Sequence, residues 1–231
     1  MKRAFVFFSL LLLLLTLPAS ATEEGDKVIY LSFDDGPGPY TERLLDILSR
    51  ENVKATFFVT GKAEAYPQLL RRMAEDGHCI ALHSYSHDYQ TIYASEAAFF
   101  ADIEKLEALI FEETGAHPTL LRFPGGSSNT VSCFNPGIMT RLCASVTERG
   151  YCYVDWHVDS RDSVGCRTTE GVLRNMQEGV EQWGDCIILQ HDIYAYSVDA
   201  VDDFIQWAKD RGYRFGVLSA DAPHGRHNVY N

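Results

Sequence analysis

Apolar residues recur along the chain in two alternating patterns. The first is a short run rich in β-branched and aromatic residues, which predicts buried strands. Such runs lie at 28–33, 55–59, 78–82, 120–123, 151–154, 186–189 and 215–218. The second pattern places apolar residues three and four positions apart and predicts helices. It covers 44–48, 67–73, 99–110, 138–146, 172–180 and 198–208. The alternation of strands and helices favours a parallel α/β fold, built as a barrel or as a doubly wound open sheet.

The N-terminal residues follow a different pattern. Met1, Lys2 and Arg3 precede an apolar run over 4–17, and small residues follow up to Ala21. This order predicts a secretory signal peptide over 1–21 that is cleaved after Ala21. An uncleaved anchor or a lipoprotein is less consistent, because the run is shorter than the about 20 apolar residues of a membrane span and no cysteine follows it. We therefore expect a secreted protein with one domain over 22–231 and no membrane span after cleavage.

The chain is acidic, with 32 Asp and Glu residues against 20 Lys and Arg residues and a formal net charge of −12. Removal of Lys2 and Arg3 with the signal peptide would change this charge to −14. Such a chain lacks the basic footprint that binds nucleic-acid phosphates and is poorly suited to anionic membranes. The composition therefore excludes nucleic acid as a partner, and we expect a soluble monomer.

Six cysteines lie at 79, 133, 143, 152, 166 and 186. An even number in a secreted chain suggests disulfides, and four of the six fall within 133–166, where a local bridge is plausible. Cys79 and Cys186 stand in apolar runs and are also consistent with small buried side chains. The absence of a Cys-x-x-Cys pair argues against a structural zinc site.

Unusual polar residues follow five of the predicted strands, at the same end of each. These are Asp34 and Asp35, then 83–87, then Arg122 with 124–126, then Asp155 and Trp156, and finally His191 and Asp192. Functional groups of parallel α/β folds collect at the carboxyl ends of the strands. Taken alone, an Asp-Asp-Gly-Pro sequence is also an ordinary turn. Five placements at one edge indicate an active site instead.

The His83 and His87 pair is the candidate metal site. The two residues are four positions apart, so a helical turn over 84–88 would place both imidazoles on one face. Two histidines and one carboxylate form a three-ligand zinc site that keeps one coordination position open for water. A strand-end aspartate can supply the carboxylate. A hydrogen-bonded structural pair is the alternative.

The combined motifs resemble those of polysaccharide deacetylases, the NodB-homology group of carbohydrate esterase family 4. The matching segments are Phe33-Asp34-Asp35-Gly36-Pro37, His83-x-x-x-His87, Arg122-x-Pro124-x-Gly126, Asp155-Trp156 and Leu189-x-His191-Asp192. They occur in the family's order and span nearly the whole chain after residue 21. The resemblance implies a distorted, incomplete (β/α)7 barrel and hydrolysis of N-acetyl groups on a glycan.

The resemblance also implies roles for the residues at the first three motifs. Asp35, His83 and His87 match the ligands of the family's metal, usually zinc or another divalent transition metal. Asp34 matches the catalytic base, and Arg122 matches the residue that orients it.

Further roles are implied by the later motifs. His191 matches the general acid, with Asp155 as its partner. Trp156 and Leu189 match the apolar walls that receive the acetyl methyl group, and the N–H of Gly125 stands at the position of the oxyanion donor. Many relatives carry an aromatic residue at position 125, so any side-chain contact from there is lost here.

The implied substrate is a cell-wall glycan. The segments 83–89 and 123–129 resemble peptidoglycan-directed members of the family more than chitin- or xylan-directed ones. Removal of N-acetyl groups from N-acetylglucosamine units of peptidoglycan is therefore the leading hypothesis. Chitin oligomers, acetyl-xylan and N-acetylmuramic acid are alternative substrates, and an inactive wall-binding protein is an alternative of another class.

Two further interpretations concern the aspartate pair and the C-terminal residues. A glycosidase would use Asp34 and Asp35 as its two carboxylates, but neighbouring residues cannot bracket a glycosidic bond. The segment 224–228 contains two histidines and could form a second metal site. We expect a poorly ordered polar terminus there instead.

Overall fold

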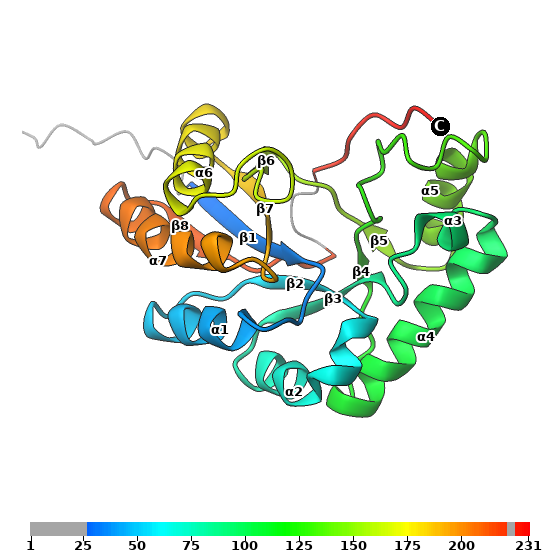
Figure 1. Ribbon diagram of the computed structural model, residues 1–231, viewed down its shortest axis with the longest axis horizontal. Coiled ribbons are helices and arrows are strands. Elements are labelled where there is room, and N and C mark those ends of the chain that lie inside the picture. Colours follow the sequence, from blue (N-terminus) through cyan, green and yellow to red (C-terminus); the bar gives the residue numbers. More distant parts are fainter. Residues whose placement is uncertain (1–26, 221–224) are drawn as a thin grey trace, which may run out of the picture.

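The computed structural model describes residues 27–220 and 225–231 (Figure 1). The predicted signal peptide and its cleavage site lie outside these residues. Within them, no helix is both long enough and apolar enough to cross a bilayer.

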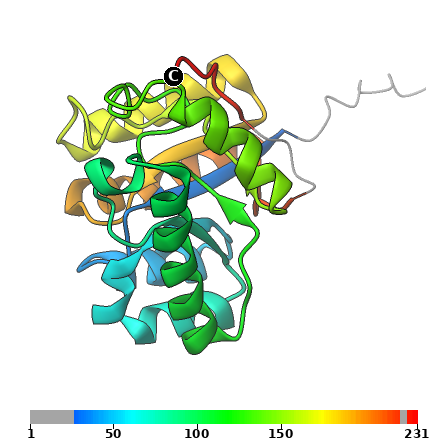
Figure 2. The ribbon, with the colours of Figure 1, turned by 90° about the vertical axis from the view of Figure 1, so that its right-hand side faces the viewer.

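Eight strands form one parallel sheet in the described part of the chain. They are β1 (Val28–Asp34), β2 (Thr56–Thr60), β3 (Cys79–Ser84), β4 (Leu120–Leu121), β5 (Cys152–Tyr153), β6 (Val158–Asp159), β7 (Cys186–His191) and β8 (Arg214–Gly216). Seven of them follow the order β5-β4-β3-β2-β1-β7-β6, and β8 pairs with the first residues of β1. The sheet curls into a half-barrel that stays open between β5 and β6 (Figures 1 and 2). The fold is thus the incomplete (β/α) barrel, and not the doubly wound alternative.

Helices cover the convex side of the sheet (Figure 1). They are α1 (Thr41–Arg50), the 3₁₀ helix η1 (Gly61–Ala65), α2 (Pro67–Glu75), α3 (Tyr89–Ile92), α4 (Glu96–Thr114), α5 (Ile138–Glu148), α6 (Thr169–Trp183) and α7 (Ala195–Asp210). Local interactions determine where several of these helices begin and end. Pro67 begins α2, where a missing N–H is harmless, and the Ser95 hydroxyl accepts from the N–H of Ala98 at the start of α4. Gly115 ends α4 with φ +70°.

The strand β1 is the centre of the sheet, because it pairs with β2, β7 and β8. Its side chains alternate between the two faces. Ile29, Leu31 and Phe33 belong to the large apolar core between sheet and helices. Ser32 and Asp34 therefore point to the other face, the inside of the half-barrel. This alternation places polar groups inside the barrel at the carboxyl end of the strand.

A second, smaller apolar cluster fills the inside of the half-barrel below these polar groups. Its buried members are Phe58, Ala81, Leu120, Val154, Ile187 and Leu218. The cluster closes the amino end of the barrel interior, so the polar groups at the carboxyl end rest on an apolar floor.

The disulfides suggested by the cysteine count are absent from the described residues. Cys79, Cys133, Cys143, Cys166 and Cys186 carry free thiols. The sheet topology explains why Cys79 and Cys186 do not form a disulfide. Cys79 begins β3 and Cys186 begins β7, and β2 and β1 lie between these two strands. Three strand spacings amount to about 14 Å, whereas a disulfide joins Cα atoms within about 7 Å.

Candidate active site

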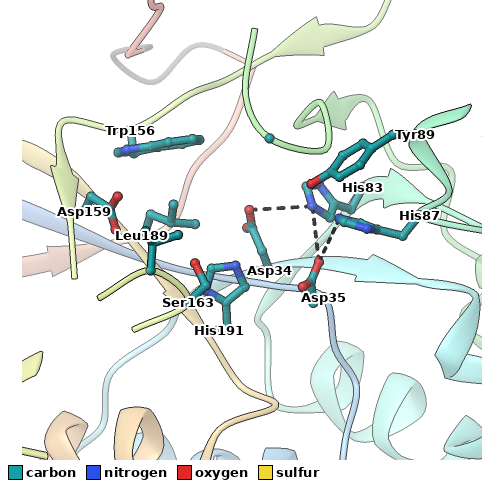
Figure 3. Close-up of a pocket in the computed structure, with 12 residues that line it drawn as sticks. Asp34, Asp35, His83, His87, Tyr89, Trp156, Asp159, Ser163, Leu189 and His191 are labelled. Atoms are coloured by element: carbon teal, nitrogen blue, oxygen red, sulfur yellow. Dashed lines mark ion pairs between the residues drawn. The ribbon is translucent and has the colours of Figure 1, made fainter. Parts of the chain in front are cut away.

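The polar residues at the strand ends surround a cavity of about 330 Å³ at the carboxyl edge of the sheet (Figure 3). It is lined by Asp34, Asp35, His83, His87, Tyr89, Gly125, Trp156, Asp159, Ser163, Val164, Leu189 and His191. Eight of these were candidates from the sequence. The remaining two candidates, Arg122 and Asp155, are buried behind the cavity wall.

Asp35, His83 and His87 converge on one point of this cavity. The Oδ1 atom of Asp35 lies 3.4 Å from Nε2 of His83 and 3.2 Å from Nε2 of His87. These ligand atoms are the only group of three or more among residues 27–220 and 225–231 that could hold one metal ion. Burial raises the pKa of Asp35, but contact with His83 and the charge of both imidazoles outweigh it and hold the pKa well below its usual range. Burial lowers the pKa of His87, which favours the neutral imidazole that a metal requires.

Two observations test whether these residues fit a cation. The Oδ1 atom of Asp35 is buried and has no hydrogen-bond partner, which is costly unless a ligand satisfies it. The Nδ1 atom of His83 lies 2.8 Å from the carbonyl oxygen of Arg122. An Nδ1–H donated to that carbonyl leaves the Nε2 lone pair free for a metal. The donor set of two imidazoles and one carboxylate therefore fits zinc or a similar divalent ion.

The loop between the two histidines is held by a buried carboxylate on α4. Asp102 accepts hydrogen bonds from the Ser84 hydroxyl (2.6 Å) and from the backbone N–H groups of Tyr85 (2.6 Å) and Ser86 (2.9 Å). The Ser84 oxygen in turn accepts from the N–H of His87 (2.9 Å). The expected helical turn over 84–88 does not form. The imidazoles meet because Asp102 folds the loop back at the end of β3.

A second buried carboxylate supports the loop that carries Asp35. Asp192 accepts a hydrogen bond from the Thr41 hydroxyl, and burial raises its pKa to about 7. A Cβ atom on Gly36 would lie 2.2 Å from the Asp192 carboxylate oxygens. Glycine at position 36 is therefore required for this loop to lie against the end of β7.

Asp34 is fixed by Arg122, which is fully buried inside the half-barrel. Its Nη1 donates to Asp34 Oδ1 (2.8 Å) and to the Ser32 hydroxyl (2.9 Å), and its Nε donates to the Val154 carbonyl (3.1 Å). The second carboxylate oxygen, Oδ2, lies 3.8 Å from Nε2 of His83. Arg122 thus occupies one oxygen of Asp34 and leaves the other facing the candidate metal site (Figure 3).

His191 pairs with Asp162, so the expected pairing with Asp155 is wrong. Asp162 Oδ1 lies 2.8 Å from Nδ1 of His191, and Oδ2 accepts from the His191 backbone N–H (2.7 Å) and the Ser197 hydroxyl (2.6 Å). Burial lowers the pKa of His191, but the hydrogen bond and charge of Asp162, helped by the aspartates of β1 and its loop, raise it to about 9. The imidazole is therefore protonated at neutral pH, with Nε2 available to the cavity.

Asp155 has a different position. Its carboxylate accepts from the N–H (2.8 Å) and hydroxyl (2.5 Å) of Ser127 and from the N–H of His227 (2.9 Å). Its backbone carbonyl accepts from Nη2 of Arg122 (3.0 Å). The contacts of its carboxylate thus lie with the loop after β4 and with the C-terminal segment. The physical reason for the difference is that β6 begins three residues after Asp155, and the loop after β6 brings Asp162 to His191.

Trp156 and Leu189 form the apolar side of the cavity, away from the imidazole pair (Figure 3). The Trp156 ring packs closely on the glycine turn after β4. A Cβ atom on Gly126 would lie 2.9 Å from the indole Cη2, and both Gly125 and Gly126 have positive φ. Glycines thus allow this turn to approach the indole.

Sequence reasoning missed Asp162, Tyr89, Asp159, Ser163 and Val164. The strand β6 is only two residues long, so its hydrophobic pattern is too short to recognise. The spacing of the aspartates over 155–162 could have indicated this strand. Asp159 and Asp162 repeat the pattern of a strand that is followed by carboxylates.

Comparison with known proteins gives relatives that match most of the chain. The family model for polysaccharide deacetylases matches residues 21–134. A peptidoglycan-N-acetylglucosamine deacetylase of Bacillus cereus is 33% identical over 210 residues, which are 87% of this chain and 72% of the relative. The peptidoglycan-N-acetylmuramic acid deacetylase PdaC of Bacillus subtilis is 34% identical over 89% of this chain and 41% of its own length.

Solved structures agree with this match. The catalytic domain of peptidoglycan N-acetylglucosamine deacetylase from Eubacterium rectale is 48% identical, with a TM-score of 0.87 over 90% of this chain and 96% of that domain. The polysaccharide deacetylase Bc1974 from Bacillus cereus is 31% identical, with a TM-score of 0.73 over 87% of this chain and 96% of its own. The protein therefore belongs to the polysaccharide deacetylase family of hydrolases.

Proposed function

We propose that this protein is a secreted, zinc-dependent deacetylase that removes N-acetyl groups from N-acetylglucosamine units of peptidoglycan. The products would be acetate and free glucosamine amines. The B. cereus and E. rectale relatives are named for this activity, which supports the choice of substrate.

The observation that carries the proposal is the buried, unpartnered Oδ1 of Asp35 between two imidazole nitrogens. Asp35, His83 and His87 would hold the zinc ion. When bound there, zinc would polarise the acetamide carbonyl and make a water molecule easier to deprotonate.

Asp34 would act as the base that takes a proton from the attacking water. Its free oxygen faces the imidazole pair, while Arg122 fixes the other oxygen. A base positioned in this way typically contributes on the order of 10²–10⁴-fold to the rate.

His191 would be the general acid. An amide nitrogen cannot leave as an anion, so a proton must reach it as the C–N bond breaks. Asp162 keeps His191 protonated at neutral pH and fixes the ring, so that Nε2 is the atom that donates. The arrangement supports proton delivery from the side of the cavity opposite to the imidazole pair (Figure 3).

Trp156 and Leu189 would receive the acetyl methyl group, since they form the apolar side of the cavity. The N–H of Gly125, which also lines the cavity, would donate to the oxygen of the tetrahedral intermediate. A donor of this kind is worth roughly 3–4 kcal/mol. The presence of both Asp34 and His191 in the cavity argues against an inactive glycan-binding protein.

The remaining parts of the proposal rest on sequence. The pattern over 1–21 supports a signal peptide, and the sheet and its helices support one catalytic domain within 22–231. We further propose a monomer, active outside the cell or at the cell wall.

Acetate release tests the function. Zinc-loaded wild-type protein should release acetate from isolated peptidoglycan and from N-acetylglucosamine oligomers, and chelation should stop this until zinc is added back. Asp34→Asn keeps the shape of the side chain but removes the base, so it should lower kcat on the order of 10²-fold or more. Absence of acetate release from every N-acetylated glycan would contradict the proposal.

N-acetylmuramic acid is a second candidate substrate, because PdaC matches 89% of this chain. Mass spectrometry of digested peptidoglycan separates the two, since the deacetylated sugar differs in each product. Free amines on muramic acid alone would replace the proposed substrate and leave the mechanism unchanged.

A further inference from the structure

The C-terminal segment 225–231 is hydrogen-bonded to the active-site wall, in contrast to the poorly ordered terminus expected from the sequence. We call this segment the C-terminal strap. The N–H of Asp155 donates to the carbonyl of Gly225 (2.7 Å), and the N–H of His227 donates to the Asp155 carboxylate (2.9 Å). The strap therefore meets the chain immediately before Trp156.

The His227 side chain contacts both sides of the wall. Its Nε2 lies 2.9 Å from the carbonyl oxygen of Trp156, which makes Nε2 the donor. Its Nδ1 is then the acceptor for the Ser128 hydroxyl at 3.2 Å. The imidazole also packs edge-on against the indole of Trp156, with 4.7 Å between ring centroids. One side chain thus joins the loop after β4 to the residue that forms the apolar wall.

The far end of the strap is anchored to the same loop and to α5. The side-chain amide of Asn231 donates to the carbonyls of Ser132 and Asn135, and its side-chain oxygen accepts from the N–H of Gly137. Its backbone carbonyl accepts from the N–H of Thr140 (2.8 Å). Figure 1 shows the strap, in red, running toward α5 beside the green loop after β4.

These contacts matter because the barrel is open between β5 and β6, where Trp156 lies. The strands hold only the ends of the segment between β5 and β6, since the N–H of Val154 donates to Leu121 of β4 and the N–H of His157 donates to Ile187 of β7, whereas no strand accepts from the N–H of Asp155. The strap takes that place, since its backbone groups at Gly225 and His227 bond to Asp155 on one side of the indole. An unsupported wall would admit larger groups and would hold the acetyl group less firmly.

We propose that the C-terminal strap supports the active site and that His227 is the residue that positions Trp156. The position of Trp156 in turn determines the size of the acyl group that the cavity accepts. The acyl-group part of this inference rests on the proposed deacetylase function. The positioning of Trp156 does not.

Two substitutions in the strap test the idea as a matched pair. His227→Ala removes both side-chain hydrogen bonds and the packing on the indole. Tyr230→Ala alters a side chain of the same strap that is 76% exposed. His227→Gln keeps an amide N–H that can reach the Trp156 carbonyl and serves as the conservative variant.

The first measurement is independent of catalysis. In a Trp183→Phe, Trp207→Phe background, Trp156 is the only tryptophan, and acrylamide quenching reports how freely solvent reaches it. We expect His227→Ala to raise the quenching constant, His227→Gln to restore most of the protection, and Tyr230→Ala to leave the constant unchanged. Equal quenching in wild type and His227→Ala, or an equal rise in Tyr230→Ala, would overturn the proposal.

The second measurement compares N-acetyl with N-propionyl chito-oligosaccharides. A shifted wall should lower kcat/KM for the acetyl substrate about tenfold. The preference for acetyl over propionyl should fall about threefold or more, because one methylene group is discriminated by pocket fit. An unchanged preference in His227→Ala would refute the role in acyl selection. If wild type releases neither group, the proposed function fails, while the quenching result still decides the positioning of Trp156.

Discussion

Replacing Asp162 by asparagine removes the carboxylate that keeps His191 protonated. The substitution keeps the size of the side chain at a buried position, so the main change is the loss of a negative charge next to Nδ1 of His191. We expect the pKa of His191 to fall and the basic limb of the pH–rate profile to move to lower pH, because the proposed general acid must carry a proton to act.

The magnitude follows from the environment of the imidazole. Asp162 and its neighbours raise the pKa of His191 from an ordinary 6.5 to about 9, although burial acts in the opposite direction. This rise corresponds to about 3 kcal/mol in favour of the protonated ring. With Asp162 neutral and burial unchanged, the pKa should fall by about 2 units or more, to roughly the ordinary value or below. At pH 7 the protonated fraction would then drop from nearly all to a minority.

The assay is kcat/KM for acetate release between pH 5 and 10 on zinc-loaded enzymes. Asp155→Asn is the matched control, since it neutralises another buried aspartate of the same segment that bonds to Ser127 and His227. We expect Asp155→Asn to lower activity through the wall of the cavity without moving the basic limb. A basic limb at the same pH in wild type and Asp162→Asn would refute the assignment, as would an equal shift in Asp155→Asn.

Three further predictions follow from other parts of the site. Asp102→Asn should weaken zinc binding on the order of 10–100-fold in competition with a chromogenic chelator, because it loosens the loop between the histidines; unchanged affinity would contradict this. Gly126→Ala should abolish most activity, because its Cβ would lie 2.9 Å from Trp156, whereas Gly115→Ala at a similar φ meets no atom within 4 Å and should cost stability alone. In metal-free protein, the raised pKa of His191 stabilises the fold fully below about pH 6.5. Urea denaturation should show this stability disappearing as pH rises through about 9, and a His191→Gln variant with the same pH slope as wild type would disprove it.

Sequence patterns predicted the long, buried parts of the fold. Strands such as β1 and β7 are mostly apolar runs that end in polar residues, and such runs are typical of the buried strands of a parallel sheet. The same rule located Asp34, Asp35 and His191, because each directly ends or follows such a strand. The structure brings these residues together with the His83 and His87 pair in one cavity.

The parts that sequence reasoning missed depend on contacts between distant segments. The strand β6 exists because two residues pair with Ile188 and Leu189 of β7, a neighbour 30 positions away. Asp162 reaches His191 only as a result of this pairing. The strap was missed for a similar reason, since nothing local in 225–231 indicates that its partners are Asp155 and Trp156.

The register of the two central strands explains why the proposed base and the proposed general acid lie side by side. Asp34 of β1 is the direct partner of His191 of β7, so both stand at the same level of the sheet, with their backbones about 5 Å apart across the two strands. Both point inside the half-barrel, because apolar Phe33 occupies the opposite face. A slip of one residue would turn Asp34 toward the helices and bury its charge in the apolar core. The hydrophobic alternation that fixes the core therefore also fixes the catalytic geometry, and the Asp35 carboxylate one residue later can then turn across the strand end to meet the imidazoles.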